Sequence, residues 1–276
     1  MPGRLALARG RARRGSRVNE RWRRRIAPAV VLLALLAAWE ALVRLAHIPH
    51  YTLPAPSLVL QTLVDNFASL AGSWWFTVKI TFGALLLACT GGVLIAAVFA
   101  LWRPVEEALF PVAVVLQVTP IVAVAPLILI YVESTTAALL LCAWIVAFFP
   151  ILSNTVVGLR AADVNLRELF RLYRASPWQR LRLLLLPSAL PYFIAGLKIS
   201  GGLSLIGAVT AEMVAGAAGR ETGLASRILE ASFRTETPKM FAALLLLVLT
   251  GVAVFVLFDR VSRRLLGRWH PAGRAP

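Results

Sequence analysis

The sequence has little of what enzymes and metalloproteins use at their sites. Its 276 residues include only two cysteines, three histidines and 13 acidic residues, beside 29 lysines and arginines. Cys89 and Cys142 both fall within apolar runs, where a cysteine is most often a small buried hydrophobe. No histidine has a cysteine or carboxylate at ligand spacing. We therefore expect no disulfide, no metal site and no bound cofactor.

Motifs for nucleotide binding and catalysis are also missing. The sequence has no G-x-x-x-x-G-K-[ST] stretch and no glycine-rich turn after a strand, so it lacks the usual means of binding a nucleotide. A Ser/His/Asp set and a paired-carboxylate site are absent from the apolar runs as well. We expect that the chain is not an enzyme and that any chemistry that powers it comes from another chain.

Long apolar runs dominate what is present. The chain is 59% hydrophobic with a mean hydropathy of +0.77, which is too much apolar surface for a soluble core of this length. Unbroken runs rich in leucine and alanine favour helices over barrel strands. Runs long enough to span a bilayer lie near 27–43, 80–101, 110–131, 137–157, 193–215 and 240–258. The sequence predicts an all-α, polytopic membrane protein with about six transmembrane helices, the third of them kinked by Pro111, Pro120 and Pro126.

The basic residues are distributed as orientation signals. Ten arginines lie between Arg4 and Arg25, and 22 of the 29 basic residues fall on one side if the amino terminus is inside. We predict a basic cytoplasmic tail over 1–25 that is attracted to anionic lipid, a transmembrane domain over 26–260 and a second cytoplasmic tail over 261–276. Because the charges flank apolar runs instead of lining one face, nucleic-acid binding is not expected.

A proline-rich break separates the first two runs. Leu53-Pro54-Ala55-Pro56-Ser57 precedes an amphipathic stretch in which apolar residues share one face. These residues are Leu60, Leu63, Val64 and Phe67. The pattern predicts a helix that lies at the outer interface of the membrane.

The hydrophilic loop 158–191 is patterned along its whole length. Leu166, Leu169, Phe170 and Tyr173 form one apolar stripe, which predicts a short amphipathic helix. A second helix is expected to begin after Ser176, where Pro177 takes the first turn and Gln179 completes a capping box, and Leu186-Pro187 is expected to end or bend it. Two short helices at an angle would suit a groove on a soluble partner, and packing against the ends of their own spans is the alternative.

In this loop the sequence resembles the membrane subunit of bacterial ABC importers, in the nitrate, sulfonate and taurine branch of the binding-protein-dependent permeases. The family motif reads E-A-A, three residues, G, nine residues, I-x-L-P. The matching positions are Glu168, Leu169, Phe170, Arg174, Leu184, Leu186 and Pro187. Further stretches agree with that branch, namely Leu53–Ser57, Phe148-Phe149-Pro150-Ile151 with Asn154, and Trp269-His270-Pro271.

The resemblance implies a function and a set of partners. It implies a permease subunit of the bacterial inner membrane that forms a homodimer and imports a small solute by alternating access. Cytoplasmic ABC ATPase subunits would supply the energy, and an extracytoplasmic binding protein would deliver the solute. The residues that it assigns to ATPase coupling are Glu168, Leu169, Arg171, Tyr173, Arg174, Ala175, Ser176, Leu186 and Pro187. A stand-alone channel or a secondary carrier is the alternative function.

Arg174 departs from the family pattern, which has glycine at this position. Glycine there supplies a turn conformation that costs another residue about 1 to 2 kcal/mol. We expect the backbone of Arg174 to stay near the right-handed helical region and its side chain to contact the ATPase.

Glu212 lies inside the fifth apolar run, where an unpaired carboxylate is costly and must face protein or water. It is either a pathway or gate residue or a structural carboxylate bonded to a neighbouring helix or loop amino terminus. The residues expected along the translocation path are Glu212, Asn154, Gly207 and Thr210. The solute stays open among sulfonates, nitrate, taurine and vitamin precursors, and the segment 212–223 is slightly more like the vitamin-precursor branch.

Overall fold

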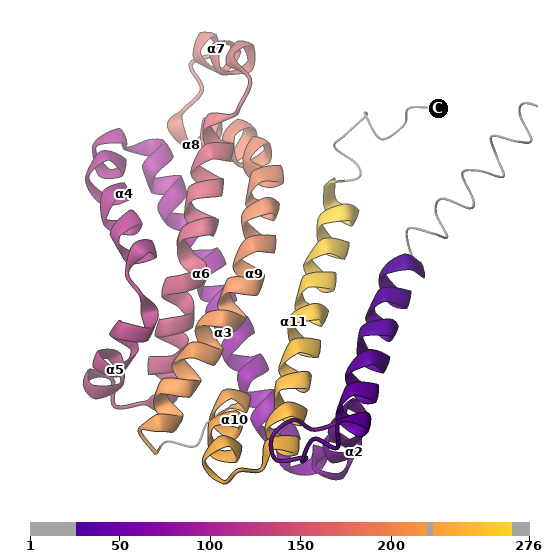
Figure 1. Ribbon diagram of the computed structural model, residues 1–276. Helices are drawn as coiled ribbons and strands as arrows, with labels where there is room; N and C mark the ends of the chain where they lie inside the picture. Colours follow the sequence, from indigo (N-terminus) through magenta and orange to yellow (C-terminus); the bar gives the residue numbers. More distant parts are fainter. Residues whose placement is uncertain (1–25, 220–222, 267–276) are drawn as a thin grey trace, which may run out of the picture.

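The computed structural model describes residues 26–219 and 223–266, and every regular element in these two ranges is a helix (Figure 1). The predicted tail 1–25 and most of the predicted tail 261–276 lie outside the described residues. The helices are an amino-terminal helix Ile26–Leu45, α2 Pro56–Asp65, α3 Phe67–Leu101, α4 Arg103–Val118, α5 Ile121–Tyr131, α6 Thr135–Arg160, α7 Val164–Leu172, α8 Pro177–Arg180, a π-helical turn Leu181–Leu185, α9 Leu186–Ala217, α10 Leu224–Phe233 and α11 Thr237–Leu266.

Five of the described helical segments are long and apolar enough to cross a membrane, and a sixth span is formed if the bent pair α4 and α5 is taken as one. The prediction of an all-α protein with about six spans is therefore confirmed. The third run is broken more sharply than a kink, because α4 and α5 meet at an angle of 101°. Thr119 and Pro120 between them are extended, as expected for a residue that precedes proline and for the proline that then begins the next helix.

The second span begins earlier than the sequence predicts. The amphipathic helix predicted after the proline-rich break is α2, which ends at Asp65, and Phe67, which was assigned to it, opens α3 instead. With 35 residues α3 is about 52 Å long at 1.5 Å per residue, well beyond the thickness of a bilayer core. Its first turns carry Ser73 and Thr77, which lowered the hydropathy of this stretch but are buried against other helices.

The centre of the bundle is made by α3, α6 and α9, with α6 packed between the other two (Figure 1). Small residues let α9 approach α6 closely. A Cβ on Gly207 would lie 2.9 Å from Ala143 Cα, and one on Gly196 would lie 2.7 Å from the Pro150 carbonyl oxygen. Ser200 Oγ donates a hydrogen bond to the Ala147 carbonyl at 2.6 Å. These contacts hold α9 against α6 within one chain.

The amino-terminal helix lies beside α11 and has few buried residues (Figure 1). A carboxylate ties it to the chain that follows. Glu40 accepts hydrogen bonds from the Ser57 backbone N–H at 3.0 Å, from Ser57 Oγ at 2.7 Å and from Arg44 Nε at 2.6 Å. Because Ser57 is in the first turn of α2, Glu40 caps that helix from a distance.

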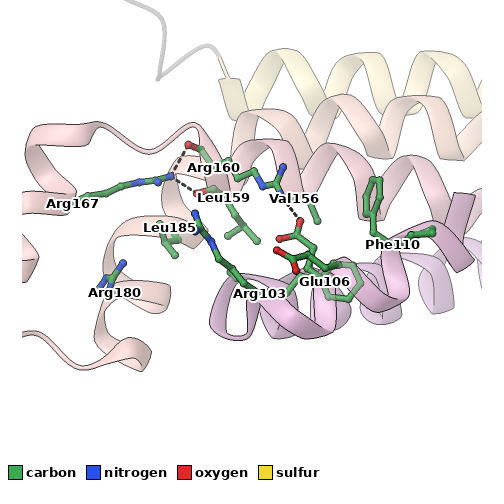
Figure 2. A pocket seen from close by; sticks show the side chains of 14 residues that line it. Arg103, Glu106, Phe110, Val156, Leu159, Arg160, Arg167, Arg180 and Leu185 are labelled. Carbon is green, nitrogen blue, oxygen red and sulfur yellow. Dashed lines mark hydrogen bonds and ion pairs between the residues drawn. The ribbon is translucent and has the colours of Figure 1, made fainter.

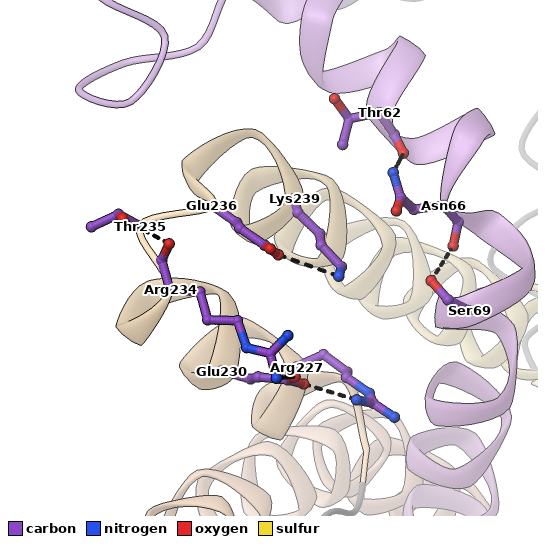
Figure 3. A network of polar contacts seen from close by, with 9 residues as sticks. All are labelled: Thr62, Asn66, Ser69, Arg227, Glu230, Arg234, Thr235, Glu236 and Lys239. Atoms are coloured by element: carbon purple, nitrogen blue, oxygen red, sulfur yellow. Dashed lines mark hydrogen bonds and ion pairs between the residues drawn. The ribbon is translucent and has the colours of Figure 1, made fainter.

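Charged residues gather where α10 turns into α11, at the end of the bundle opposite α7 (Figures 1 and 3). Arg227 Nη1 and Arg234 Nη2 lie 2.8 and 2.9 Å from the two oxygens of Glu230. Lys239 Nζ lies 3.3 Å from Glu236 Oε2 in the same corner. The hydrogen bond from Arg227, with the positive charges of Arg227, Arg234 and Lys239, holds the pKa of Glu230 below its ordinary value.

This pKa shift predicts how the corner responds to acid. A carboxylate whose folded pKa is lowered stabilises the fold above its unfolded pKa of about 4.3 and loses that contribution as the pH falls through the folded pKa. We expect the protection factors of the α10 amides, which correct each exchange rate for the intrinsic rate at that pH, to fall below about pH 4.3 in the native chain and to change less with pH in Glu230→Gln. Equal acid sensitivity in both proteins would contradict this assignment.

Candidate functional site

The loop 158–191 lies at one end of the bundle, where α7 projects beyond the other helices (Figure 1). Asp163 begins α7 as an amino-terminal cap, since its Oδ1 accepts hydrogen bonds from the backbone N–H groups of Asn165 and Leu166 at 2.8 and 3.1 Å. The predicted amphipathic helix is present as α7, although Tyr173 lies just past its last residue as the carboxy-terminal cap.

Arg174 closes α7 in a left-handed conformation, with φ of +49°. The expectation that it stays near the right-handed helical region is therefore wrong. The Ala175 N–H donates to the Phe170 carbonyl at 2.9 Å, and the Arg174 N–H donates to the Arg171 carbonyl at 3.0 Å. This is the bonding pattern of a Schellman motif, which requires positive φ at the residue that Arg174 occupies. The turn that glycine makes in the family is thus kept, at the expense of backbone strain.

Replacing Arg174 by glycine is expected to stabilise α7. Glycine removes a left-handed penalty of about 1 to 2 kcal/mol, partly offset by the greater freedom of glycine in the opened state. Exchange of the α7 amides should slow by about fivefold for a net gain of roughly 1 kcal/mol. Arg174→Ala is the matched control, because it removes the side chain but keeps the strain, and slower exchange in both variants would contradict the assignment.

The capping box predicted at the start of the second helix is confirmed. Ser176 Oγ accepts a hydrogen bond from the Gln179 N–H at 3.2 Å, and Gln179 Oε1 accepts one from the Ser176 N–H at 2.8 Å. The helix then continues past Leu186-Pro187 instead of ending there, through the π turn Leu181–Leu185 and into α9.

Proline has no N–H to donate, and the wider turn accommodates this gap. The Leu186 N–H donates to the Leu181 carbonyl, and Ser188 Oγ donates to the Leu184 carbonyl at 2.8 Å. The second half of the loop and α9 consequently form one continuous helical segment, Pro177–Ala217, which includes the fifth predicted span.

Part of the loop packs on the bundle, and another part is exposed. Leu181 and Leu184 are buried in the core cluster, and Phe170 packs against it. Leu172 and Tyr173, by contrast, are 80% and 79% exposed. Of the predicted apolar stripe only Phe170 packs on the spans, whereas Leu166, Leu169 and Tyr173 are exposed, and docking of this surface on a soluble partner stays a prediction.

A cavity of about 710 Å³ lies between this loop and the adjoining ends of α3, α4 and α6 (Figure 2). Arg160 Nη2 lies 2.5 Å from Glu106 Oε1, which joins α6 to α4. Arg167 Nη2 donates to the Leu159 and Arg160 carbonyls at 3.0 and 2.6 Å, so α7 is fixed to the end of α6. From the sequence alone these arginines were interpreted only as orientation signals. Residues 103, 160, 167 and 180 are separated along the chain, and no sequence pattern indicates that they line one cavity.

Glu212 is completely buried near the opposite end of α9. Its Oε2 accepts hydrogen bonds from Thr77 Oγ1 at 3.0 Å and from the Ala225 N–H at 3.2 Å, and the Leu224 N–H donates to Thr77 Oγ1 at 2.9 Å. These two N–H groups begin α10, so the carboxylate lies at a helix amino terminus. This geometry is the one expected for a structural carboxylate bonded to a helix amino terminus. A role for Glu212 in the translocation path stays a prediction.

The other residues expected along the path do not gather around Glu212. Asn154 Nδ2 donates to the Pro150 carbonyl at 2.8 Å on α6, and it packs beside Gly196, about 24 Å along α9 from Glu212. Gly207 faces Ala143 of α6, and Thr210 is half-buried. Any shared path would have to run along the length of α9.

Comparisons with known proteins agree with this architecture. Residues 88–267 match the family described as binding-protein-dependent transport system inner membrane component. The riboflavin transport system permease protein RibX of Chloroflexus aurantiacus is 35% identical over 87% of this chain and 88% of that protein. The formylaminopyrimidine transport permease protein ThiX of Halalkalibacterium halodurans is 30% identical over 87% of this chain and 94% of that protein.

Solved structures show the same fold. An inward-facing structure of the MetNI methionine ABC transporter aligns with 71% of this chain and 95% of the matched chain, with a TM-score of 0.60 at 20% identity. The resemblance inferred from the loop motif is confirmed by the family match and by the two relatives. The chain belongs to the inner membrane components of binding-protein-dependent transport systems and is a permease subunit of the ABC importer family.

Proposed function

We propose that two copies of this chain, with two cytoplasmic ATPase subunits and an extracytoplasmic binding protein, import a small solute by alternating access. The observation that carries the proposal is the exposed end of α7, where Leu172 and Tyr173 are bare on a segment held rigid by the Schellman turn and the capping box. Exposed apolar side chains on a rigid element are what a groove on a soluble partner binds. In this proposal both termini and the α7 end face the cytoplasm.

Helix α9 would carry the movement of the ATPase into the membrane. Its continuity with α8 through the π turn means that closure of an ATPase around the loop would tilt or shift the fifth span as one body. Coupling would involve the whole set proposed from the family motif, with Glu168 and Arg171 on α7 and Leu186 and Pro187 at the start of α9.

The face of α9 that points away from α6 would meet the second copy. Ile199 and Ile206 are more than half exposed on this face, and nothing occupies the space that a Cβ on Gly202 would enter. Apolar side chains beside a small residue suit close contact between membrane helices. The path would then lie between two α9 helices, with Thr210 near it and with Gly207 and Glu212 fixing the helix from behind. Asn154 lies on the α6 side of α9, so in this arrangement it would contribute to the path only beyond the edge of α9.

The solute that we propose is a vitamin-related heterocycle, because the names of the two relatives reported above refer to riboflavin and to formylaminopyrimidine. Sulfonates, nitrate and taurine are the competing solutes. Uptake of each solute in separate assays, with a binding protein encoded beside this chain, would decide among them.

Reconstitution into proteoliposomes tests the function. The chain is assembled with its ATPase and binding protein, and solute uptake is measured with ATP, with a nonhydrolysable analogue and without the ATPase. We expect uptake only with hydrolysable ATP and the complete set. Solute flux through the chain alone would overturn the importer proposal and favour a stand-alone channel or a secondary carrier.

A further inference from the structure

The cavity at the α7 end is lined by arginines that are not among the residues assigned to ATPase coupling (Figure 2). Four arginines line it, and they come from four different segments. They are Arg103 at the start of α4, Arg160 at the end of α6, Arg167 of α7 and Arg180 of α8. We propose that this cavity binds the phosphate of an anionic phospholipid headgroup.

The guanidinium groups have donors to spare. Two carboxylates, Glu106 and Glu107, also line the cavity, and Arg160 is paired with the first of them. Arg103 and Arg180 make no ion pair or side-chain hydrogen bond within 26–219 and 223–266. Arg167 uses Nη2 for two carbonyls, but its Nε is buried without a partner among the same residues. The excess of arginine over glutamate leaves forked donors that match a phosphate.

The rest of the lining favours a lipid over a free phosphate. Apolar side chains from α3, α4 and α6 also line the cavity, among them Phe99, Phe110 and Leu159. The volume of about 710 Å³ is that of a small-molecule pocket, with room for a headgroup and the start of an acyl chain. Basic pockets between membrane helices on the cytoplasmic side suit the headgroups of anionic lipids.

A bound phosphate would connect the loop to the spans. It would lie near Arg103 at the start of α4, and it would bridge to α7 and α8 through Arg167 and Arg180. The inference rests on the proposed function in one respect, which is that the α7 end faces the cytoplasm. The lipid would then limit how far the loop moves relative to α4.

Photo-cross-linking tests the site on the purified full chain without any ATPase, so failure of the transport proposal does not affect the result. The probe is a phosphatidylglycerol with a diazirine near the glycerol, in phosphatidylcholine nanodiscs, and the readout is which peptides are labelled. We expect labels on peptides that contain the cavity wall and their displacement by unlabelled phosphatidylglycerol. The position of the labelled peptides distinguishes lipid in this cavity from lipid bound by the predicted basic tail 1–25.

Arg103→Gln/Arg180→Gln should lower cavity labelling by about 30-fold, since each basic side chain near an anionic headgroup contributes roughly fivefold. Arg182→Gln/Arg264→Gln is the matched control, because it removes two exposed arginines that do not line the cavity and should leave labelling unchanged. Arg103→Lys/Arg180→Lys should fall between the two.

Three results would overturn the proposal. Labelling that is spread along all spans, or that persists in the double glutamine variant while that variant remains monodisperse, would show that the cavity holds no lipid headgroup. Displacement of the probe by inorganic phosphate as readily as by phosphatidylglycerol would leave a phosphate site but rule out the lipid as its occupant.

Discussion

Tyr173→Asp is expected to weaken binding of the ATPase subunit by about 30-fold or more and to lower ATP-driven uptake with it. Tyr173 is 79% exposed at the tip of α7, beside the equally bare Leu172, and the caps at both ends of the helix fix its position. An aromatic anchor that is buried in a partner groove contributes 2 kcal/mol or more, and a buried aspartate adds a desolvation cost. The binding constant of the ATPase for nanodiscs that carry the chain is the direct measurement.

Two controls make this result specific. Tyr173→Phe keeps the ring and should bind nearly as well as the native chain. Tyr131→Asp makes the same chemical change at a residue that is 83% exposed and ends α5, a helix at the opposite end of the bundle from α7 (Figure 1), and it should leave ATPase binding unchanged. Loss of binding in Tyr131→Asp as well would point to general misfolding, and full binding by Tyr173→Asp would place the docking surface elsewhere.

The membrane spans could be predicted from the sequence because their information is local. A long run of leucine and alanine is by itself sufficient to indicate a membrane span, and hydropathy therefore located five spans and the bent pair. The start of α3 was missed for the opposite reason. Ser73 and Thr77 are polar and therefore lower the hydropathy of this stretch. In the structure Ser73 Oγ accepts a hydrogen bond from Arg227 Nε at 3.1 Å, and Thr77 Oγ1 donates one to Glu212. Both partners are distant in the sequence, so a local pattern does not reveal them.

The loop shows the same division between local and distant information. The capping box of Ser176 and Gln179 involves neighbours only, and the sequence predicted it correctly. The left-handed Arg174 was missed because side-chain preference argued against the conformation, whereas the Schellman bonds of α7 demand it. The arginine-lined cavity was not predictable, since it exists only where four chain segments converge.

Glu212→Ala is expected to lower the free energy of unfolding by about 3 kcal/mol. The carboxylate is wholly buried and accepts from Thr77 Oγ1 and the Ala225 N–H. Thr77 Oγ1 can still donate to the Ser73 carbonyl at 3.2 Å, so removal of the carboxylate leaves the buried Ala225 N–H without its acceptor and a cavity beside it. Reversible unfolding of the purified chain in mixed micelles gives the value. Glu212→Gln keeps an acceptor oxygen and should cost much less.

Transport by the glutamine variant separates the two roles of this residue. If Glu212 only holds α10 against α3, a folded Glu212→Gln protein should import at close to the native rate. If the charge also serves the path, the variant should be stable but slow. A stable variant with severely reduced uptake would therefore favour a pathway role over the structural one.

Gly223 supplies an independent check of the same contact. A Cβ on Gly223 would overlap the Glu212 carboxylate, so Gly223→Ala should be destabilising by itself. In Glu212→Ala/Gly223→Ala the new methyl group enters the space that the carboxylate has vacated, and the double variant should lose less stability than the sum of the single changes. Strict additivity would mean that Glu212 and Gly223 do not touch, and the placement of the carboxylate at the start of α10 would then be wrong.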